Sequence, residues 1–467
     1  MAPSEHQQAP PPMTKILERC LVAPAPGTVK PSALPLTFFD YIFLPFHPVQ
    51  RVFFYELPCS RLLFLSDHLP HLKLSLSLAL LEFRPLAGSL VLPPQCSSPE
   101  VRCGDGDAVE FTVAECSDNF HYLAGNHARD AARLHPLVPQ LLLPGVGSRR
   151  APVLALQATI FPGVGVAVGI AVQHAVADGS TSAHFLKTWA ATCRLGRKGV
   201  LGVSCVGGPP TYDRTVIRDP MRLGRTFLAD LQMLREDSRM EAWDLAGRSD
   251  IVRGTFIVTN EKIQQLSQRF TSKTSLECSP YTLASGLVWV CLVKAKGLDD
   301  VGGDTTEHFG FVTGCRARMD PQAPATYFGN CLGICCVEAS RSDLVGEDGA
   351  VAASTAIRKV IRGVEERGGA FRGAENWIRD IFRLAALGIL TVAGSPKLGM
   401  YQVDFGWGRP RKVEMVSIER TGAMSIAEAK EEEGGGLEFG LVLPREEMAR
   451  FSGFFADGLK QLSCSWS

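Results

Sequence analysis

The sequence predicts an α/β protein with more than one domain. The chain has 467 residues, which is enough for two or three domains with sizeable cores. Apolar runs with strand character alternate with runs that carry apolar residues at helical spacing. No repeat with a period of about 20–50 residues is present, so we expect a globular α/β protein rather than a solenoid or propeller.

The first half of the chain predicts strands and helices in alternation. Residues 52–57 form a β-rich run, and the closely spaced leucines of residues 70–83 predict a largely buried helix. Pro85 ends that helix, and a turn leads to a strand over 89–92. Residues 151–172 are apolar, but prolines, a glutamine and glycines interrupt them, which favours two buried strands and a turn over a membrane span.

The next segments predict a helix, a linker and a hairpin. Residues 180–194 carry apolar side chains at helical spacing, whereas 195–220 is rich in glycine and proline and predicts a linker. The acidic run 425–433 predicts a helix, and residues 437–443 predict a strand. The glycine triplet between them predicts a hairpin or loop rather than a phosphate-binding loop, because no helix follows it.

Composition excludes several classes of protein. Lys plus Arg equals Asp plus Glu at 48 each, so no net charge attracts nucleic acid or an anionic membrane. The first residues are polar and proline-rich, without the apolar core of a secretory signal. The 14 cysteines then indicate reduced thiols in the cytoplasm. Cys331, Cys335 and Cys336 have no companion cluster at zinc-site spacing. We therefore expect these cysteines to be small apolar side chains of a strand, and we expect no bound metal.

The sequence His174-Ala-Val-Ala-Asp178-Gly179 places a histidine where a buried strand ends. A histidine there can take up a proton near neutral pH, so His174 is a candidate general base. Asp178 and Ser180 both stand where a helix N-cap is expected. A capping or ion-pair role for Asp178 is favoured over direct proton transfer. A zinc pair of His174 and Asp178 lacks a companion motif.

A second unusual block, Asp404-Phe-Gly-Trp-Gly408, stands near the C-terminus. The two blocks in this order resemble the signature of the BAHD acyltransferases, which move acyl groups from coenzyme A thioesters to hydroxyls or amines. Five further segments match the family's blocks in order: Leu34–Asp40 (LPLTFFD), Phe83–Gly88 (FRPLAG), Tyr212–Arg214 (YDR), Arg316–Arg318 (RAR) and Ser395–Lys397 (SPK). Tyr327–Cys331 (YFGNC) resembles the mark of the branch that acylates anthocyanins and other phenolic glycosides, in which malonyl-CoA is the commonest donor.

The resemblance implies a fold and a mode of action. It implies two α/β domains of mixed sheets flanked by helices, similar to chloramphenicol acetyltransferase. These are residues 1–194 and 221–467, with 195–220 as a long crossover loop. No permanently bound cofactor is implied. The expected partners are an acyl-CoA donor, malonyl-CoA first, and a phenolic glycoside acceptor, bound by a cytoplasmic monomer that binds no nucleic acid or membrane.

The resemblance also assigns site residues. His174 is the general base in a channel open from both faces, and Asp178, followed by Gly179, points away and pairs with Arg316 or Arg318. Asp404 belongs to a block that holds the channel wall, although it is also described as a second proton acceptor. Trp407 is either a packing residue or, through its indole N–H, an oxyanion donor.

Seven residues are candidates for contact with the substrates or CoA: Thr37, Asp40, Lys187, Ser279, Pro280, Tyr281 and Arg409. Pro280 stands where relatives carry a CoA-contacting residue, and it offers neither a hydroxyl nor an N–H. The free carboxylate of malonyl-CoA needs a cation in a dry channel. Lys187 and Arg409 are the candidates, with a solvated surface position as the alternative for each.

The favoured function is therefore transfer of a malonyl or similar group to a sugar hydroxyl of a phenolic or flavonoid glycoside. Direct transfer needs no nucleophilic serine or cysteine, and the sequence contains no GxSxG motif. One alternative is a hydroxycinnamoyl-CoA-dependent O- or N-acyltransferase. A different class is a non-catalytic ligand-binding relative, against which the intact His174 and Asp404 argue.

Overall fold

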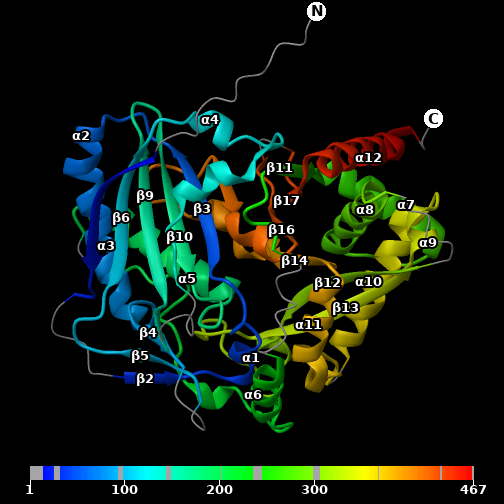
Figure 1. The fold of residues 1–467 in the computed structure, drawn as a ribbon, viewed down its shortest axis with the longest axis horizontal. Helices are drawn as coiled ribbons and strands as arrows, with labels where there is room; N and C mark the ends of the chain where they lie inside the picture. The colour runs from blue at the N-terminus through cyan, green and yellow to red at the C-terminus, as the bar shows by residue number, and fades with distance from the viewer. Residues whose placement is uncertain are drawn as a thin grey trace, which may run out of the picture.

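The computed structural model describes residues 14–25, 32–92, 98–142, 149–200, 202–234, 244–297, 305–366, 368–431 and 434–464. Within these ranges the fold is mixed α/β, with three sheets flanked by helices (Figure 1). The predicted fold class is confirmed. No helix in these ranges is both long and apolar enough to cross a membrane.

The first large sheet has six strands in the order β1-β6-β9-β10-β3-β15. Its strands are β1 (Thr14–Val22), β3 (Val49–Glu56), β6 (Val109–Cys116), β9 (Leu154–Phe161), β10 (Gly165–Val172) and β15 (Lys412–Met415). The β6–β9 pair is parallel and the other neighbours are antiparallel. Strands β9 and β10 are buried along their whole length, as expected for a central pair covered on both faces.

The second large sheet has seven strands in the order β13-β12-β14-β16-β17-β11-β7. Its strands are β7 (Arg129–Asp130), β11 (Ile251–Val258), β12 (Thr306–Gly314), β13 (Leu332–Ser340), β14 (Leu390–Gly394), β16 (Ala423–Glu428) and β17 (Leu437–Pro444). A small antiparallel sheet is formed by β2 (Ser32–Pro35), β4 (Ser89–Val91), β5 (Glu100–Cys103) and β8 (Arg150–Pro152).

Two groups of helices cover the two large sheets (Figure 1). Helices α3 and α5 pack together against the six-stranded sheet, where the indole of Trp189 donates to the carbonyl of Leu72 at 3.1 Å. Helices α7, α8, α10 and α12 enclose the core of the seven-stranded sheet. The α-helices are α1 (Phe38–Tyr41), α2 (Arg61–Leu63), α3 (Leu69–Glu82), α4 (Phe120–Leu123), α5 (Gly179–Gly196), α6 (Leu223–Leu234), α7 (Asn260–Thr274), α8 (Pro280–Ala295), α9 (Arg341–Val345), α10 (Gly349–Glu365), α11 (Trp377–Ala386) and α12 (Arg445–Cys464).

The two halves of the chain exchange strands. Strand β15 comes from the C-terminal half but pairs with β3, and β7 comes from the N-terminal half but pairs with β11. Buried charges join the sheets at this exchange, where Glu414 of β15 contacts Arg129 and Arg253. Burial raises the pKa of the Glu414 carboxyl, but the surrounding cations, Arg129 foremost, hold it at about 2. The two sheets are thus held in one arrangement by charge as well as by pairing.

Most of the predicted elements are confirmed, and one is wrong. The helix expected over 70–83 is α3, the helix over 180–194 is α5, and the apolar run 151–172 forms β8, β9 and β10. The helix predicted over 425–433 is wrong, because residues 423–428 form β16, which pairs with β14 and β17; residues 432 and 433 lie outside the described ranges. The glycine triplet closes the β16–β17 hairpin. The described residues of 195–220 that follow α5 contain one short 3-10 helix, Arg214–Val216, and one isolated bridge, from Thr211 to Tyr327, and otherwise turns and irregular backbone. The domain boundaries stay a prediction.

Candidate active site

The loop that carries His174 connects β10 to α5. Gln173 is buried and its amide donates to the carbonyls of Leu142 and Pro152, which anchors the start of the loop. Asp178 is the N-cap of α5, since its Oδ1 accepts from the backbone N–H of Thr181 at 2.9 Å. A Cβ at Gly179 would lie 2.9 Å from Cδ1 of Leu398, so a glycine is needed for this close approach.

The His174 ring is half-buried and held by stacking. The ring of Phe43 lies parallel to it, with centroids 3.9 Å apart and planes 2° apart. The Nδ1 atom is enclosed without a hydrogen-bond partner, whereas Nε2 is not enclosed. Burial lowers the pKa of His174 below 6.5, against smaller opposing effects of its own backbone carbonyl and of Asp178. The imidazole is therefore neutral near pH 7 and able to accept a proton at Nε2.

Arg316, not Arg318, is the arginine that pairs with Asp178. Its Nη1 and Nη2 lie 2.6 and 3.1 Å from the two carboxylate oxygens, and the Asp178 side chain is fully buried. Arg318 instead donates to the carbonyl of Gly314 and is exposed to solvent. This geometry leaves the Asp178 carboxylate fully engaged and fits the capping and ion-pair role.

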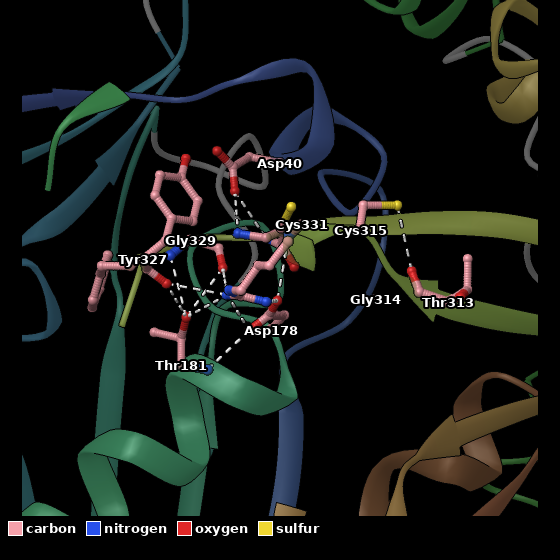
Figure 2. A network of polar contacts seen from close by, with 12 residues as sticks. Asp40, Asp178, Thr181, Thr313, Gly314, Cys315, Tyr327, Gly329 and Cys331 are labelled. Carbon is pink, nitrogen blue, oxygen red and sulfur yellow. Dashed lines mark hydrogen bonds and ion pairs between the residues drawn. The ribbon is translucent and has the colours of Figure 1, made fainter. Parts of the chain in front are cut away.

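The YFGNC segment closes around the same ion pair (Figure 2). The carbonyls of Tyr327 and Gly329 accept from Nη2 of Arg316 at 3.1 and 3.0 Å, and the N–H of Cys331 points to Asp178 Oδ2 at 3.3 Å. The hydroxyl of Thr181 also reaches this segment, at 3.1 Å from the Gly329 carbonyl. The first turn of α5 is thus fixed to the loop before β13.

A second chain of hydrogen bonds links the N-terminal block to His174. Asp40 is fully buried, and its Oδ1 accepts from the backbone N–H and the side-chain amide of Asn330, both at 2.9 Å. The same amide donates to the His174 carbonyl at 2.9 Å. Asp40 Oδ2 accepts from the N–H and hydroxyl of Thr37.

The structure gives both Thr37 and Asp40 protein partners. The Asp40 carboxylate is fully buried and is held by Thr37 and Asn330. Contact of either residue with a substrate stays a prediction. The asparagine had no predicted role. Its polar side chain between Gly329 and Cys331, in an otherwise apolar block, was the available signal, because a buried amide needs partners.

The Asp404–Gly408 loop lies at the other end of α5. Asp404 Oδ1 accepts from the N–H groups of Gly406, Trp407 and Gly408 at 2.7, 3.1 and 2.9 Å. Its Oδ2 lies 3.5 Å from Arg194, in the last turn of α5. Arg194 is about 22 Å along the helix axis from the start of α5. The structure therefore does not bring Asp404 to His174, and a role as second proton acceptor has no geometric support.

Trp407 does not reach the His174 loop either. Its ring packs edge-on against Tyr55 and His68, with centroids 5.4 and 5.9 Å apart. The indole Nε1 is enclosed without a hydrogen-bond partner in the described chain. The contacts fit the packing role and give the oxyanion-donor role no support.

The two candidate cations for malonate differ in position. Lys187 is half-buried on α5, and its Nζ donates to Oε1 of Gln402 at 3.2 Å. Arg409 is exposed after the Asp404–Gly408 loop, so the alternative of a solvated surface position holds for it.

The three predicted CoA-contact residues form the start of α8. Ser279 is the N-cap, and its hydroxyl accepts from the N–H of Thr282 at 3.2 Å. Pro280 follows at the first helical position, where a missing N–H costs nothing, and both residues are exposed. Tyr281 packs edge-on against Phe311. Ser279 and Pro280 remain open to a ligand, whereas Tyr281 belongs to the edge of the core.

One group in the described residues could hold a metal ion. His308, Cys336 and Glu338, on β12 and β13, have ligand atoms within 4.8 Å of one another. Cys336 is one of the cysteines expected only to fill a strand. Glu338 is 59% exposed, and none of the three contacts the His174 loop. The group plays no part in the site described above.

Comparison with known proteins identifies the family. The model of the Transferase family matches residues 13–457. The chain is 35% identical to malonyl-coenzyme:anthocyanin 5-O-glucoside-6'''-O-malonyltransferase of Salvia splendens, over 95% of each chain. It is 36% identical to phenolic glucoside malonyltransferase 1 of Nicotiana tabacum, over 89% of this chain and 92% of that one. A coumaroyl-CoA:anthocyanidin 3-O-glucoside-6''-O-coumaroyltransferase of Arabidopsis thaliana is 32% identical, over 98% and 99%.

Solved structures agree on the fold. Vinorine synthase superposes with a TM-score of 0.68 at 21% identity, covering 94% of this chain and 96% of that one. The TRI101 protein of F. graminearum, complexed with ethyl coenzyme A, superposes with a TM-score of 0.62 at 15% identity, covering 91% and 97%. The chain belongs to the Transferase family of BAHD acyltransferases.

Proposed function

We propose that this acyltransferase moves a malonyl or similar acyl group from coenzyme A to a sugar hydroxyl of a phenolic or flavonoid glycoside. The observation that carries the proposal is the His174 ring: neutral, fixed by Phe43, and with only Nε2 left open. The names of the relatives, which include malonyltransferases of anthocyanin and phenolic glucosides, support the choice of donor and acceptor.

In the proposed reaction Nε2 of His174 accepts the proton of the sugar hydroxyl as the oxygen attacks the thioester carbon. The C–O bond forms and a tetrahedral oxyanion results. Its collapse breaks the C–S bond, and the leaving CoA thiolate takes the proton back from His174. Asp178 and Arg316 hold the loop in place and exchange no proton.

A coumaroyl donor is the second candidate, because a relative of almost equal length carries that activity in its name. Transfer to an amine instead of a hydroxyl is a further alternative, which depends on the residues that line the acceptor pocket. The non-catalytic alternative is disfavoured, since a ligand-binding relative has no need for a neutral histidine with one free nitrogen. We further propose a cytoplasmic monomer with domains at 1–194 and 221–467 and a crossover at 195–220.

The test is a matrix of donors and acceptors with the purified protein. Malonyl-, acetyl- and coumaroyl-CoA are each combined with anthocyanin, flavonol and simple phenolic glucosides, and CoA release is measured with product mass. We expect transfer to a glucoside with malonyl-CoA as the best donor. Absence of transfer with every donor would contradict the proposed function.

The pH dependence of the reaction tests the role of His174 separately. The base must be neutral, so protonation as the pH falls through its pKa removes activity. Because burial lowers that pKa, the acid limb of kcat/KM is expected at a midpoint below pH 6.5. A midpoint above pH 6.5 would show that the site favours the protonated form of His174. It would contradict the role of a neutral His174 as the general base.

A further inference from the structure

Arg51 is a buried cation with almost no partner. It is the third residue of β3, between Gln50 and the apolar run Val52–Tyr55, and is only 6% exposed. Its Nη1 lies 3.5 Å from the sulfur of Met400, a weak acceptor, and the other two nitrogens have no partner among the described residues. Burial lowers the pKa of Arg51 to about 10, so it is still charged at pH 7. A buried charge in this state is costly unless a counter-ion binds to it.

The free nitrogens of Arg51 face accessible space. Enclosed nitrogens without a partner include Nε of Arg129 and Nε of Arg253, but no atom of Arg51. Arg129 and Arg253 both contact Glu414, whereas Arg51 contacts no carboxylate in the described chain. Of these three buried arginines, Arg51 is therefore the one with donors left for a ligand.

Segment 398–402 connects Arg51 to the His174 loop and to Lys187. Its first residue, Leu398, packs on Gly179, and Met400 contacts Arg51. Its last residue, Gln402, accepts from Lys187. In the sheet, Arg51 pairs with Ile170, four residues before His174. Arg51 and Lys187 thus contact the same short segment, which begins beside Gly179 at the start of α5.

Arg51 and Lys187 are influenced by one shared carboxylate. Glu428 is the carboxylate whose field acts on both Arg51 and Lys187. Its Oε1 accepts from the N–H of Tyr401 at 3.1 Å, and its Oε2 is enclosed without a partner. Glu438, which accepts from the hydroxyl of Tyr401, is instead paired with Lys412. Arg51 and Lys187 thus share the field of one carboxylate, and neither is paired with it in an ion pair in the described chain.

We infer that Arg51, assisted by Lys187, binds the free carboxylate of a dicarboxylic acyl donor and so selects malonyl-CoA over acetyl-CoA. This inference rests on the proposed function, and it adds Arg51 to the candidate Lys187. The guanidinium can form two parallel N–H···O bonds with a carboxylate. The carboxylate of malonyl-CoA lies one methylene from the reacting carbonyl, so a cation that binds it also sets the position of that carbonyl relative to His174.

The test compares donors within one preparation of each variant. Arg51→Met keeps an unbranched side chain similar to the apolar stem of arginine and removes the charge, and kcat/KM is measured with malonyl-CoA and with acetyl-CoA. We expect the ratio of the two values to fall at least tenfold, since charge-assisted hydrogen bonds are lost for one donor only. Arg51→Lys should restore part of the ratio. Arg61→Met, which removes an exposed arginine paired with Glu115, is the matched control and should leave the ratio unchanged.

Glu428→Gln supplies a test of opposite sign. It keeps the acceptor for Tyr401 but removes the negative charge that competes for the cations, so the malonyl-to-acetyl ratio should rise. Equal losses for both donors in Arg51→Met would assign the cluster to the CoA phosphates or to packing and overturn the inference. A parent enzyme that transfers acetyl and malonyl equally well would also overturn it. A parent inactive with every donor would contradict the proposed function instead.

Discussion

The loop before α5 and the loop of residues 404–408 are built in the same way but placed differently. In each, an aspartate carboxylate accepts hydrogen bonds from the backbone N–H groups that follow it. Asp178 is also fully buried and paired with Arg316 at 2.6 Å, next to His174. Asp404 is partly exposed and lies 3.5 Å from Arg194, at the far end of the same helix.

The difference shows that two aspartates with similar backbone hydrogen bonds can contribute unequally to the stability of the protein. Removing one partner of a buried ion pair leaves an uncompensated charge and costs about 3–5 kcal/mol, whereas an exposed pair contributes about 0–1 kcal/mol. Asp178 and Arg316 therefore fix the geometry of the base, while Asp404 shapes a loop and adds little energy through its charge.

The largest effect is expected for His174→Ala. Loss of a general base typically lowers the rate by about 10²–10⁴-fold. The fold should persist, since the side chain is half-buried and its nitrogens bond to no described residue. Single-turnover rates and circular dichroism would check both points. A kcat within tenfold of the parent would show that another group accepts the proton.

The next effect is that of Asp178→Asn. It breaks the buried pair with Arg316, so stability should fall by about 3–5 kcal/mol and activity should fall with it. Denaturant unfolding and kcat are measured together. Asp118→Asn, which breaks a less buried pair with Arg133, should lower stability without lowering kcat. An Asp178→Asn protein as stable as the parent but inactive would mean that Asp178 takes part in proton transfer.

A smaller loss is expected for Asn330→Ala. The amide links Asp40 to the His174 carbonyl, so its loss should lower kcat about tenfold with little change in KM. Asn126→Ala removes an amide that accepts from the buried Lys412, away from the His174 loop. That control should lower the melting temperature and leave kcat unchanged. Equal kcat values for Asn330→Ala and Asn126→Ala would contradict the positioning role of Asn330.

The fold was largely predictable because periodicity is a local property. The leucines of α3 and the apolar runs of β9 and β10 show their structure in the sequence alone. The run 425–433 was assigned wrongly because its alanines and glutamates favour a helix, while pairing with β14 and β17 imposes a strand. The exchange of β7 and β15 depends on contacts between distant segments, which no local pattern reports.

The candidate site was predictable in part for the same reason. His174 and the N-cap Asp178 follow from a strand end and a helix start that are adjacent in sequence. The choice of Arg316 over Arg318 and the link from Asp40 through Asn330 depend on side chains 138 and 290 residues apart. Arg51 was missed because an arginine within a strand is ordinarily an exposed residue of its edge or outer face.

The smallest effect is expected for Asp404→Asn, and it tests the contrast most sharply. The asparagine Oδ1 can still accept from the N–H groups of Gly406 and Gly408. Only the charged contact with Arg194 is lost, which is worth about 0–1 kcal/mol. The melting temperature should therefore fall by at most a few degrees, and kcat should stay within tenfold. Asp404→Ala removes the acceptor itself and should cost more stability. If Asp404→Asn were stable but as inactive as His174→Ala, Asp404 would be catalytic, and the two loops would have to approach each other during the reaction.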